Sequence, residues 1–227
     1  MAESEFVIPH PFAFRHPTTI MIAGPTMSGK TRLLVRMLKE GLFQPRPTRL
    51  VWVYGEYQSI YDEVKALWPR AEFEREMTPE LYESIKPDEV NMVVLDDKMN
   101  DESGSKTLSK LFTQGAHHRN LTVIFIVQNL FYQGESMRTV SLNCHYMILF
   151  KNPRDKGQIR ALGSQMYPGD GNFLVSAYRD ATDARYGYLL LDLHPETPED
   201  LRVRTGVFAD DVGHVYLPRR YKKGSKH

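Results

Sequence analysis

An eight-residue glycine-rich segment constrains this chain more than any other feature of its sequence. It matches the pattern G-x-x-x-x-G-K-[ST] at every fixed position and consists of Gly24, Pro25, Thr26, Met27, Ser28, Gly29, Lys30 and Thr31. Apolar residues 18–23 precede it and read as a strand, and residues 28–40 follow it with helical spacing of apolar side chains. This strand, loop and helix context is the one that a phosphate-binding loop requires.

The residue types of this loop suit a bound polyphosphate. Glycine lets the backbone wrap closely around phosphate oxygens. Backbone N–H groups of residues 27–31 would point at those oxygens, helped by the positive end of the helix dipole. Lys30 would bridge the β- and γ-phosphates, and the Thr31 hydroxyl would ligate Mg²⁺. The loop therefore predicts ATP and Mg²⁺ as cofactors.

Short apolar runs alternate with helical patterns along the chain, which predicts an α/β fold with a mostly parallel central sheet flanked by helices. We expect strands at 18–23, 50–54, 90–95, 121–127 and 145–150, the fourth of them central. Expected helices cover 28–40, 78–85, 105–115, 155–163 and 172–179, with Thr78 as a cap and Gly41 as a stop. Residues 186–191 and 203–208 are expected to add edge strands. One domain is predicted over 17–217, between an extension at 1–16 and a basic tail at 218–227.

Composition narrows the class of protein. The chain has 227 residues, 41% of them hydrophobic and 25% charged, as in ordinary globular proteins. One cysteine, Cys144, excludes an internal disulfide and cysteine-rich metal clusters and suits a reducing, intracellular setting. No secretory signal or membrane-length apolar run is present, so we expect no membrane partner. The net charge of +1 predicts no partner, although the basic tail permits a nucleic-acid surface.

Polar residues at two strand ends complete the expected site. The third strand ends in Asp96 and Asp97, where Asp96 would hold Mg²⁺ through a water molecule. The general base that polarises the attacking water is either Asp97, whose side chain is one methylene shorter than the usual glutamate, or Glu56 after the second strand. Gln128, at the end of the fourth strand, is expected to orient that water. A solvated strand end is the alternative for the aspartates, and a capping turn residue for Gln128.

Arginine completes many oligomeric ATPase sites, because a residue from one subunit stabilises transition-state charge in the next. Arg119, just before the fourth strand, is the first candidate for this role. Arg138 and Arg154 are weaker ones.

These segments together resemble the FtsK–HerA superfamily, and within it the genome-packaging ATPases of poxvirus-like viruses, virophages and Polinton-like elements. The resembling residues span about two thirds of the chain and are 10–12, 24–31, 53–56, 93–97, 117–129 and 143–155. The more specific part is His117-His118-Arg119, an apolar strand, Gln128 and then Phe150-Lys151-Asn152-Pro153-Arg154-Asp155.

The resemblance implies a RecA-like core of the ASCE type and a homo-oligomeric ring of six or five subunits. It also implies an intracellular or virion-associated motor that translocates double-stranded DNA, regardless of sequence, into a preformed capsid, with capsid vertex proteins as further partners. A motor that grips any sequence would contact DNA phosphates, and the candidates in this chain are Lys151, Arg154, Lys156 and Arg160, near the end of the fifth strand, and the basic tail. A solvated surface is the alternative for these residues.

Three other functions share the phosphate loop. A P-loop phosphotransferase would need an acceptor pocket and an arginine-bearing lid, neither of which the sequence marks. A GTPase would need Asn-Lys-x-Asp for guanine, whereas the chain has Lys151-Asn152-Pro153-Arg154. A nucleotide-gated assembly factor that does not hydrolyse ATP remains the third alternative, because Asp97 departs from the family pattern.

Overall fold

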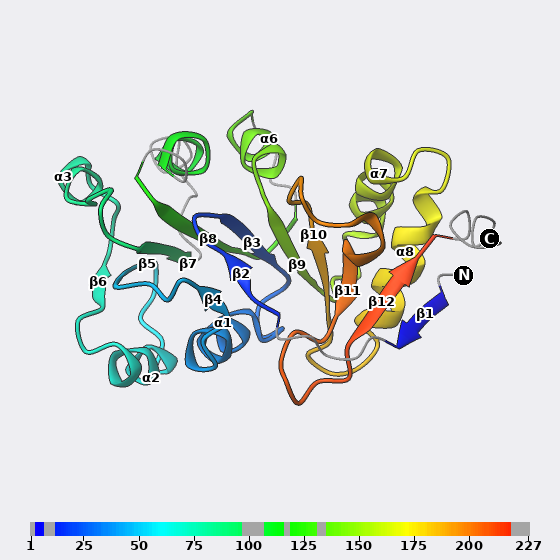
Figure 1. Ribbon diagram of the computed structural model, residues 1–227, viewed down its shortest axis with the longest axis horizontal. Coiled ribbons are helices and arrows are strands. Elements are labelled where there is room, and N and C mark those ends of the chain that lie inside the picture. Colours follow the sequence, from blue (N-terminus) through cyan, green and yellow to red (C-terminus); the bar gives the residue numbers. More distant parts are fainter. Residues whose placement is uncertain (1–2, 7–11, 97–106, 116–118, 131–134, 219–227) are drawn as a thin grey trace.

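The computed structural model describes residues 3–6, 12–96, 107–115, 119–130 and 135–218. A ten-stranded sheet runs through the molecule in the order β1-β12-β11-β10-β9-β3-β8-β7-β5-β6 (Figure 1). Its strands are β1 (Glu3–Phe6), β3 (Thr19–Ala23), β5 (Arg49–Tyr54), β6 (Glu72–Glu74), β7 (Asn91–Asp96), β8 (Leu121–Val127), β9 (Tyr146–Phe150), β10 (Tyr188–Asp192), β11 (Val203–Thr205) and β12 (His214–Leu217).

Strand direction divides this sheet into two parts. Strands β9, β3, β8, β7, β5 and β6 are mutually parallel. Strands β10, β11, β12 and β1 continue the sheet with antiparallel pairs. The expectation that residues 186–191 and 203–208 form edge strands is wrong, because β10 and β11 are each paired on both sides and β1 and β6 lie at the edges. The expected central position of β8, between β3 and β7, is confirmed.

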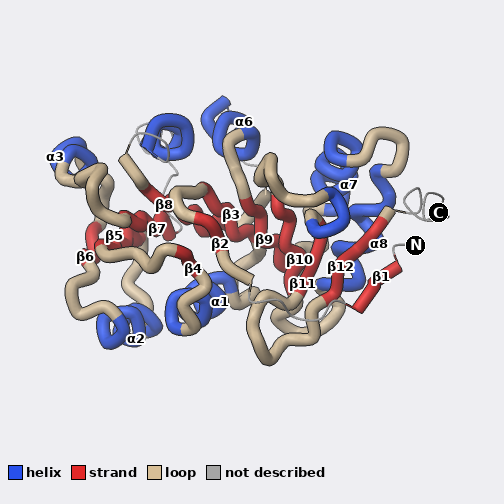
Figure 2. Tube along the Cα trace, viewed as in Figure 1, coloured by secondary structure: helices blue, strands red, loops and turns tan. Residues whose placement is uncertain are grey.

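Helices cover both faces of the sheet (Figure 2). One face carries α1 (Lys30–Lys39) and α2 (Ile60–Leu67), and the other carries α3 (Pro79–Glu83), the π-helical turn η1 (Leu111–Gly115), α6 (Glu135–Leu142), α7 (Lys156–Met166) and α8 (Gly171–Ala181). A 3-10 turn, η2 (Glu199–Leu201), precedes β11. Of the helix expected at 105–115, residues 107–110 are helical and run into η1, while 97–106 lie outside the described residues.

The alternation of side chains along the strands builds a separate core on each face. On β3, Met21 and Ala23 pack with apolar residues of α7 and α8, whereas Ile20 and Ile22 pack with those of α1 and α2. All seven residues of β8 are buried, as expected of a strand that is covered on both faces. The hydrophobic effect therefore holds α1, and with it the phosphate loop, on the middle of the sheet.

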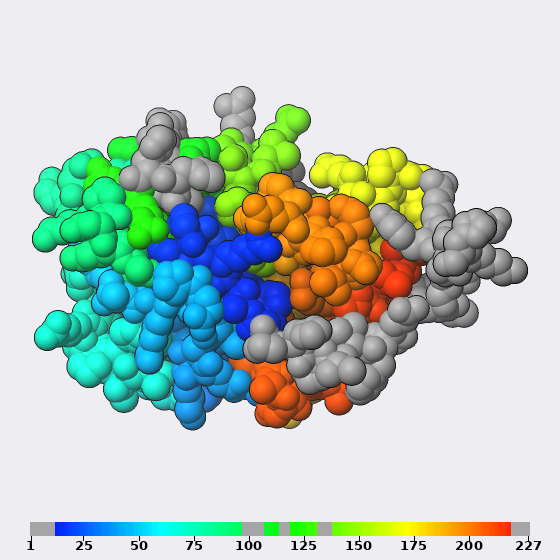
Figure 3. Space-filling view, in the orientation of Figure 1, coloured from blue at the N-terminus to red at the C-terminus, as the bar shows by residue number. Residues whose placement is uncertain are grey.

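A small second sheet joins the N-terminal segment to the rest. It pairs β2 (Phe14–Arg15) with β4 (Phe43–Gln44), and the rings of Phe14 and Phe43 stack at 5.4 Å. The Arg15 guanidinium donates to Nδ1 of His194, which follows β10 (Tyr188–Asp192), over 3.0 Å. The space-filling view shows this N-terminal segment, in blue, between cyan and orange surfaces (Figure 3). It ties the parallel half of the sheet to the antiparallel half.

Local capping signals of the sequence are confirmed. The Thr78 hydroxyl accepts from the Leu81 N–H over 3.2 Å at the start of α3, and Pro79 occupies its first turn. Helix α1 ends at Lys39, and Gly41 follows with a left-handed φ of 71°.

Candidate nucleotide-binding site

The phosphate loop joins the carboxyl end of β3 to α1. The Gly24 N–H donates to the Val127 carbonyl over 3.1 Å, and the chain then turns through positive φ angles at Met27 (64°) and Gly29 (102°). A Cβ atom on Gly24 would lie 2.6 Å from Cβ of Phe150, so only glycine fits there. No described side chain caps the N-terminus of α1, whose first turn also holds no acid. Its first N–H groups therefore suit an anion.

Lys30 folds back over the loop that it follows. Its Nζ donates to the carbonyl oxygens of Gly24 over 2.7 Å and Pro25 over 3.0 Å. The ammonium group is thus held against the backbone of the loop, at the place where a polyphosphate would contact it.

Asp96 lies at the end of β7, beside the start of α1. The residue is buried, at 3% exposure, and Oδ2 accepts from the Tyr61 hydroxyl over 2.8 Å. The Thr31 hydroxyl lies 3.5 Å from the same oxygen. The structure therefore brings together the two residues, 65 positions apart, that the sequence predicts as Mg²⁺ ligands. Tyr61 is not among the residues that the sequence predicts, because α2 places it there only through packing.

The other predicted polar residues are placed as follows. Gln128 follows β8, the neighbour of β7, and lines the same cavity as Lys30, Thr31 and Asp96. Glu56 is exposed in the loop after β5, where the Gly55 N–H donates to the Asp96 carbonyl over 3.3 Å. Asp97, like His117 and His118, lies outside the described residues, so the choice of general base stays a prediction.

Arg119 lies just before β8, at the amino ends of the parallel strands, whereas the phosphate loop lies at their carboxyl ends. Its Nη1 donates to the carbonyl oxygens of Tyr82 and Ile85, each over 3.1 Å, and the guanidinium pairs with the Glu83 carboxylate. It also lies 4.4 Å from the centre of the Tyr82 ring. Within its own chain Arg119 therefore secures the end of α3 and does not approach the phosphate loop.

The phosphate loop opens into a cavity of about 1170 Å³. Beside the predicted residues, this cavity is lined by the segment before β10, by the loop between β11 and β12 and by the start of β12, including Arg185, Tyr186, Gly206, Val212 and His214. These residues follow the phosphate loop by more than 150 positions. No local motif marks them, which is why the sequence did not indicate them.

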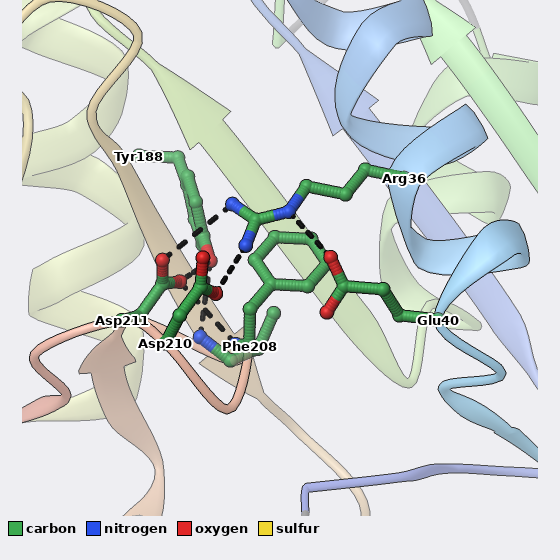
Figure 4. Close-up of polar contacts among 7 residues, drawn as sticks. Arg36, Glu40, Tyr188, Phe208, Asp210 and Asp211 are labelled. Carbon is green, nitrogen blue, oxygen red and sulfur yellow. Dashed lines mark hydrogen bonds and ion pairs between the residues drawn. The ribbon is translucent and has the colours of Figure 1, made fainter.

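An ion-pair cluster fixes the β11–β12 loop on α1 (Figure 4). The Arg36 guanidinium contacts the carboxylates of Asp210 and Asp211 and lies 3.7 Å from the centre of the Phe208 ring. The Tyr188 hydroxyl lies 3.4 Å from an Asp211 oxygen. Burial, and after it the charge of Asp211, raises the pKa of Tyr188, so its hydroxyl stays protonated and donates. These contacts therefore hold the part of the cavity wall that the β11–β12 loop forms.

Within the described ranges, no helix combines the length and apolar composition that crossing a bilayer requires.

Comparison with known proteins identifies the fold. The genome packaging NTPase B204 from Sulfolobus turreted icosahedral virus 2, in complex with sulfate, aligns at a TM-score of 0.54 and 12% identity over 86% of this chain and 96% of that chain. Its complex with ATP-gammaS aligns at a TM-score of 0.52 and 14% identity over 83% and 95% of the two chains. No protein-family model and no curated protein matches this sequence. The likeness confirms the predicted resemblance at the level of the fold: the chain has the α/β, RecA-like P-loop NTPase fold of this viral packaging NTPase.

Proposed function

We propose that this chain is a Mg²⁺-dependent ATPase that moves double-stranded DNA into a preformed viral capsid. The observation that carries the proposal is the convergence of the phosphate loop, the Thr31–Asp96 pair and Gln128 on one cavity. The shared fold of a protein named as a genome packaging NTPase supports the packaging role.

The residues present fit a nucleotide with a hard divalent cation. Mg²⁺ prefers oxygen ligands, and the Thr31 hydroxyl and Asp96 carboxylate supply them 3.5 Å apart. When bound, Mg²⁺ would neutralise charge on the phosphates. Lys30 would exchange its two backbone carbonyl partners for phosphate oxygens. Gln128 would orient the lytic water, and Asp97 or Glu56 would accept its proton.

Hydrolysis by water is the first part of the proposal to test. The purified protein should release inorganic phosphate from ATP in the presence of Mg²⁺ with no other acceptor, and EDTA should stop the release. A P-loop phosphotransferase would need an added acceptor. A nucleotide-gated assembly factor would bind ATP without turnover. Either result would contradict the ATPase.

Four exposed basic residues that follow β9 are the proposed DNA contacts. Lys151, Arg154, Lys156 and Arg160 are all exposed, from the end of β9 along α7. The backbone between them is fixed, because the buried Asn152 side chain donates to Asp155 over 2.8 Å. Their position at the same end of the sheet as the phosphate loop suits coupling between ATP and DNA.

Removing two of these charges should weaken DNA stimulation and leave nucleotide binding intact. Each DNA phosphate that the protein neutralises adds about 0.9 to the slope of log affinity against log salt, so Lys151→Ala with Lys156→Ala should lower that slope by up to about 2. The measurement is ATP turnover against duplex DNA at several salt concentrations. The matched control is Lys39→Ala with Lys86→Ala, two exposed lysines elsewhere. Unchanged, salt-sensitive stimulation in the first variant would exclude this patch.

A ring allows Arg119 to act in a neighbouring subunit, although it secures α3 in its own. Mixing Lys30→Ala with Arg119→Ala subunits tests this role. If Arg119 serves the adjacent site, the mixture should recover activity that neither variant has, because some interfaces then hold both residues. No recovery under subunit exchange would leave Arg119 with the structural role that its contacts to Tyr82, Glu83 and Ile85 describe.

A further inference from the structure

Three exposed apolar side chains gather in the nucleotide cavity. Among the described residues, five large hydrophobic side chains are exposed, and three of them line this cavity: Met27 (92% exposed), Tyr186 (56%) and Val212 (58%). An apolar group left open to water inside a cavity is typical of a surface that a ligand covers.

Backbone conformation singles out two of these residues. Met27 and Tyr186 have φ angles of 64° and 63°, a left-handed conformation that bulky side chains rarely adopt. Strain of this kind collects at ligand sites, where the surrounding structure maintains it. The Tyr186 ring lies against the phosphate loop, since a Cβ on Gly29 would be 3.0 Å from its Cδ1. Arg185 holds the ring by donating to its hydroxyl over 2.9 Å.

The topology of the sheet places these residues where a nucleoside would lie. Asp96 ends β7 and Gln128 follows β8, on one side of β3, and both would lie at the γ-phosphate end of a bound triphosphate. Tyr186 and Val212 precede β10 and β12, on the other side of β3 (Figure 1). A triphosphate held by the loop between them would extend its base towards β10–β12. There, Arg36 holds the loop that carries Val212 (Figure 4).

We propose that this half of the cavity is a nucleobase subsite, in which the base stacks on Tyr186 and contacts Val212 and Met27. The inference rests on the proposed function, because it takes the phosphates to be in the loop. An aromatic ring contacts the face of a base, which all bases share, and not its hydrogen-bonding edge. The subsite should therefore accept ATP and GTP alike.

The test compares a ligand that has a base with one that lacks it. Binding of ATP, GTP and inorganic tripolyphosphate is measured for the unmodified protein and for Tyr186→Ala. Because removal of a stacking aromatic ring weakens binding by about 5- to 100-fold, Tyr186→Ala should lose that much affinity for ATP and for GTP. Affinity for tripolyphosphate should not change. Tyr186→Phe keeps the ring and loses only the hydroxyl contact with Arg185, so it should bind ATP and GTP much more tightly than Tyr186→Ala does.

Leu142→Ala is the matched control, because Leu142 is 72% exposed and does not line the cavity. An unchanged ATP affinity in Tyr186→Ala would overturn the subsite. So would an equal loss for tripolyphosphate, which would mean that Tyr186 acts on the phosphate loop through Gly29. A loss for ATP alone would contradict stacking. If the unmodified protein binds tripolyphosphate but ATP no more tightly, the subsite fails and the phosphate loop stands. If it binds neither, the proposed function fails as well.

Discussion

Lys30→Ala should lower the rate of ATP hydrolysis by about a hundred- to a thousandfold, the effect of removing one preorganised charge contact to a transition state. The Lys30 ammonium already lies 2.7 Å and 3.0 Å from two carbonyl oxygens of the phosphate loop, so it needs little movement to reach a bound phosphate. Alanine leaves the N–H groups of the loop in place. Single-turnover phosphate release should therefore fall far more than ATP affinity does.

Lys39→Ala is the control for this variant, because Lys39 is exposed in the last turn of the same helix. It should hydrolyse ATP at the unmodified rate. Lys30→Ala should keep a thermal unfolding midpoint close to that of the unmodified protein, since the core residues of α1 are unchanged. Full turnover in Lys30→Ala would contradict the assignment of this loop as the catalytic phosphate site.

Asp96→Asn should have the second large effect, a loss of hydrolysis of at least about a hundredfold, because a neutral amide binds Mg²⁺ poorly. Asp96 is buried and its carboxylate accepts from the Tyr61 hydroxyl, which fixes the orientation of the side chain. The variant should bind ATP equally well with and without Mg²⁺. The unmodified protein should bind it more tightly with the metal. A Mg²⁺ dependence that survives in Asp96→Asn would place the metal elsewhere.

Tyr61→Phe removes only the hydroxyl that holds Asp96. Residues that orient a metal ligand typically contribute 10- to 100-fold to metal affinity or activity, so this variant should require more Mg²⁺ for half-maximal turnover. Saturating Mg²⁺ should restore much of its rate, which it should not do for Asp96→Asn. The control is Asp88→Asn, because Asp88 is exposed and precedes the start of β7, away from the site. This variant should behave as the unmodified protein does.

The parts of the fold that the sequence predicted are those with local signals. Residues 24–31 form a contiguous motif, and the buried strands β3, β5, β7, β8 and β9 are continuous apolar runs of the kind that central parallel strands require. β10 carries the same signal, with all five residues buried, and the expectation of an edge position for it was wrong. Its antiparallel partner β11 has three residues, too few to form a clear pattern.

The site residues that tertiary packing brings together could not be predicted from the sequence. Tyr61 belongs to the eight-residue helix α2, which was not among the predicted helices although Ile60, Val64 and Leu67 have helical spacing. Its contact with Asp96 also depends on the packing of α2 beside α1, which no local pattern encodes. Tyr186 and Val212 line the cavity beside the phosphate loop because β10 and β12 both run opposite to β3 and β9, which brings the loops before them to that end of the sheet. For Arg119, the position before β8 predicted a catalytic role. The sequence did not indicate that its guanidinium donates to carbonyl oxygens at the end of α3.

The most direct test of the central claim is the rate of ATP hydrolysis by the unmodified protein with and without duplex DNA, at rising salt and beside Lys30→Ala, with the oligomeric state measured in the same sample. A DNA motor predicts turnover that duplex DNA of any sequence raises, that salt lowers in step with DNA affinity, and that falls by about a hundred- to a thousandfold in Lys30→Ala. Turnover by the assembled oligomer that is indifferent to DNA at every salt concentration would contradict it.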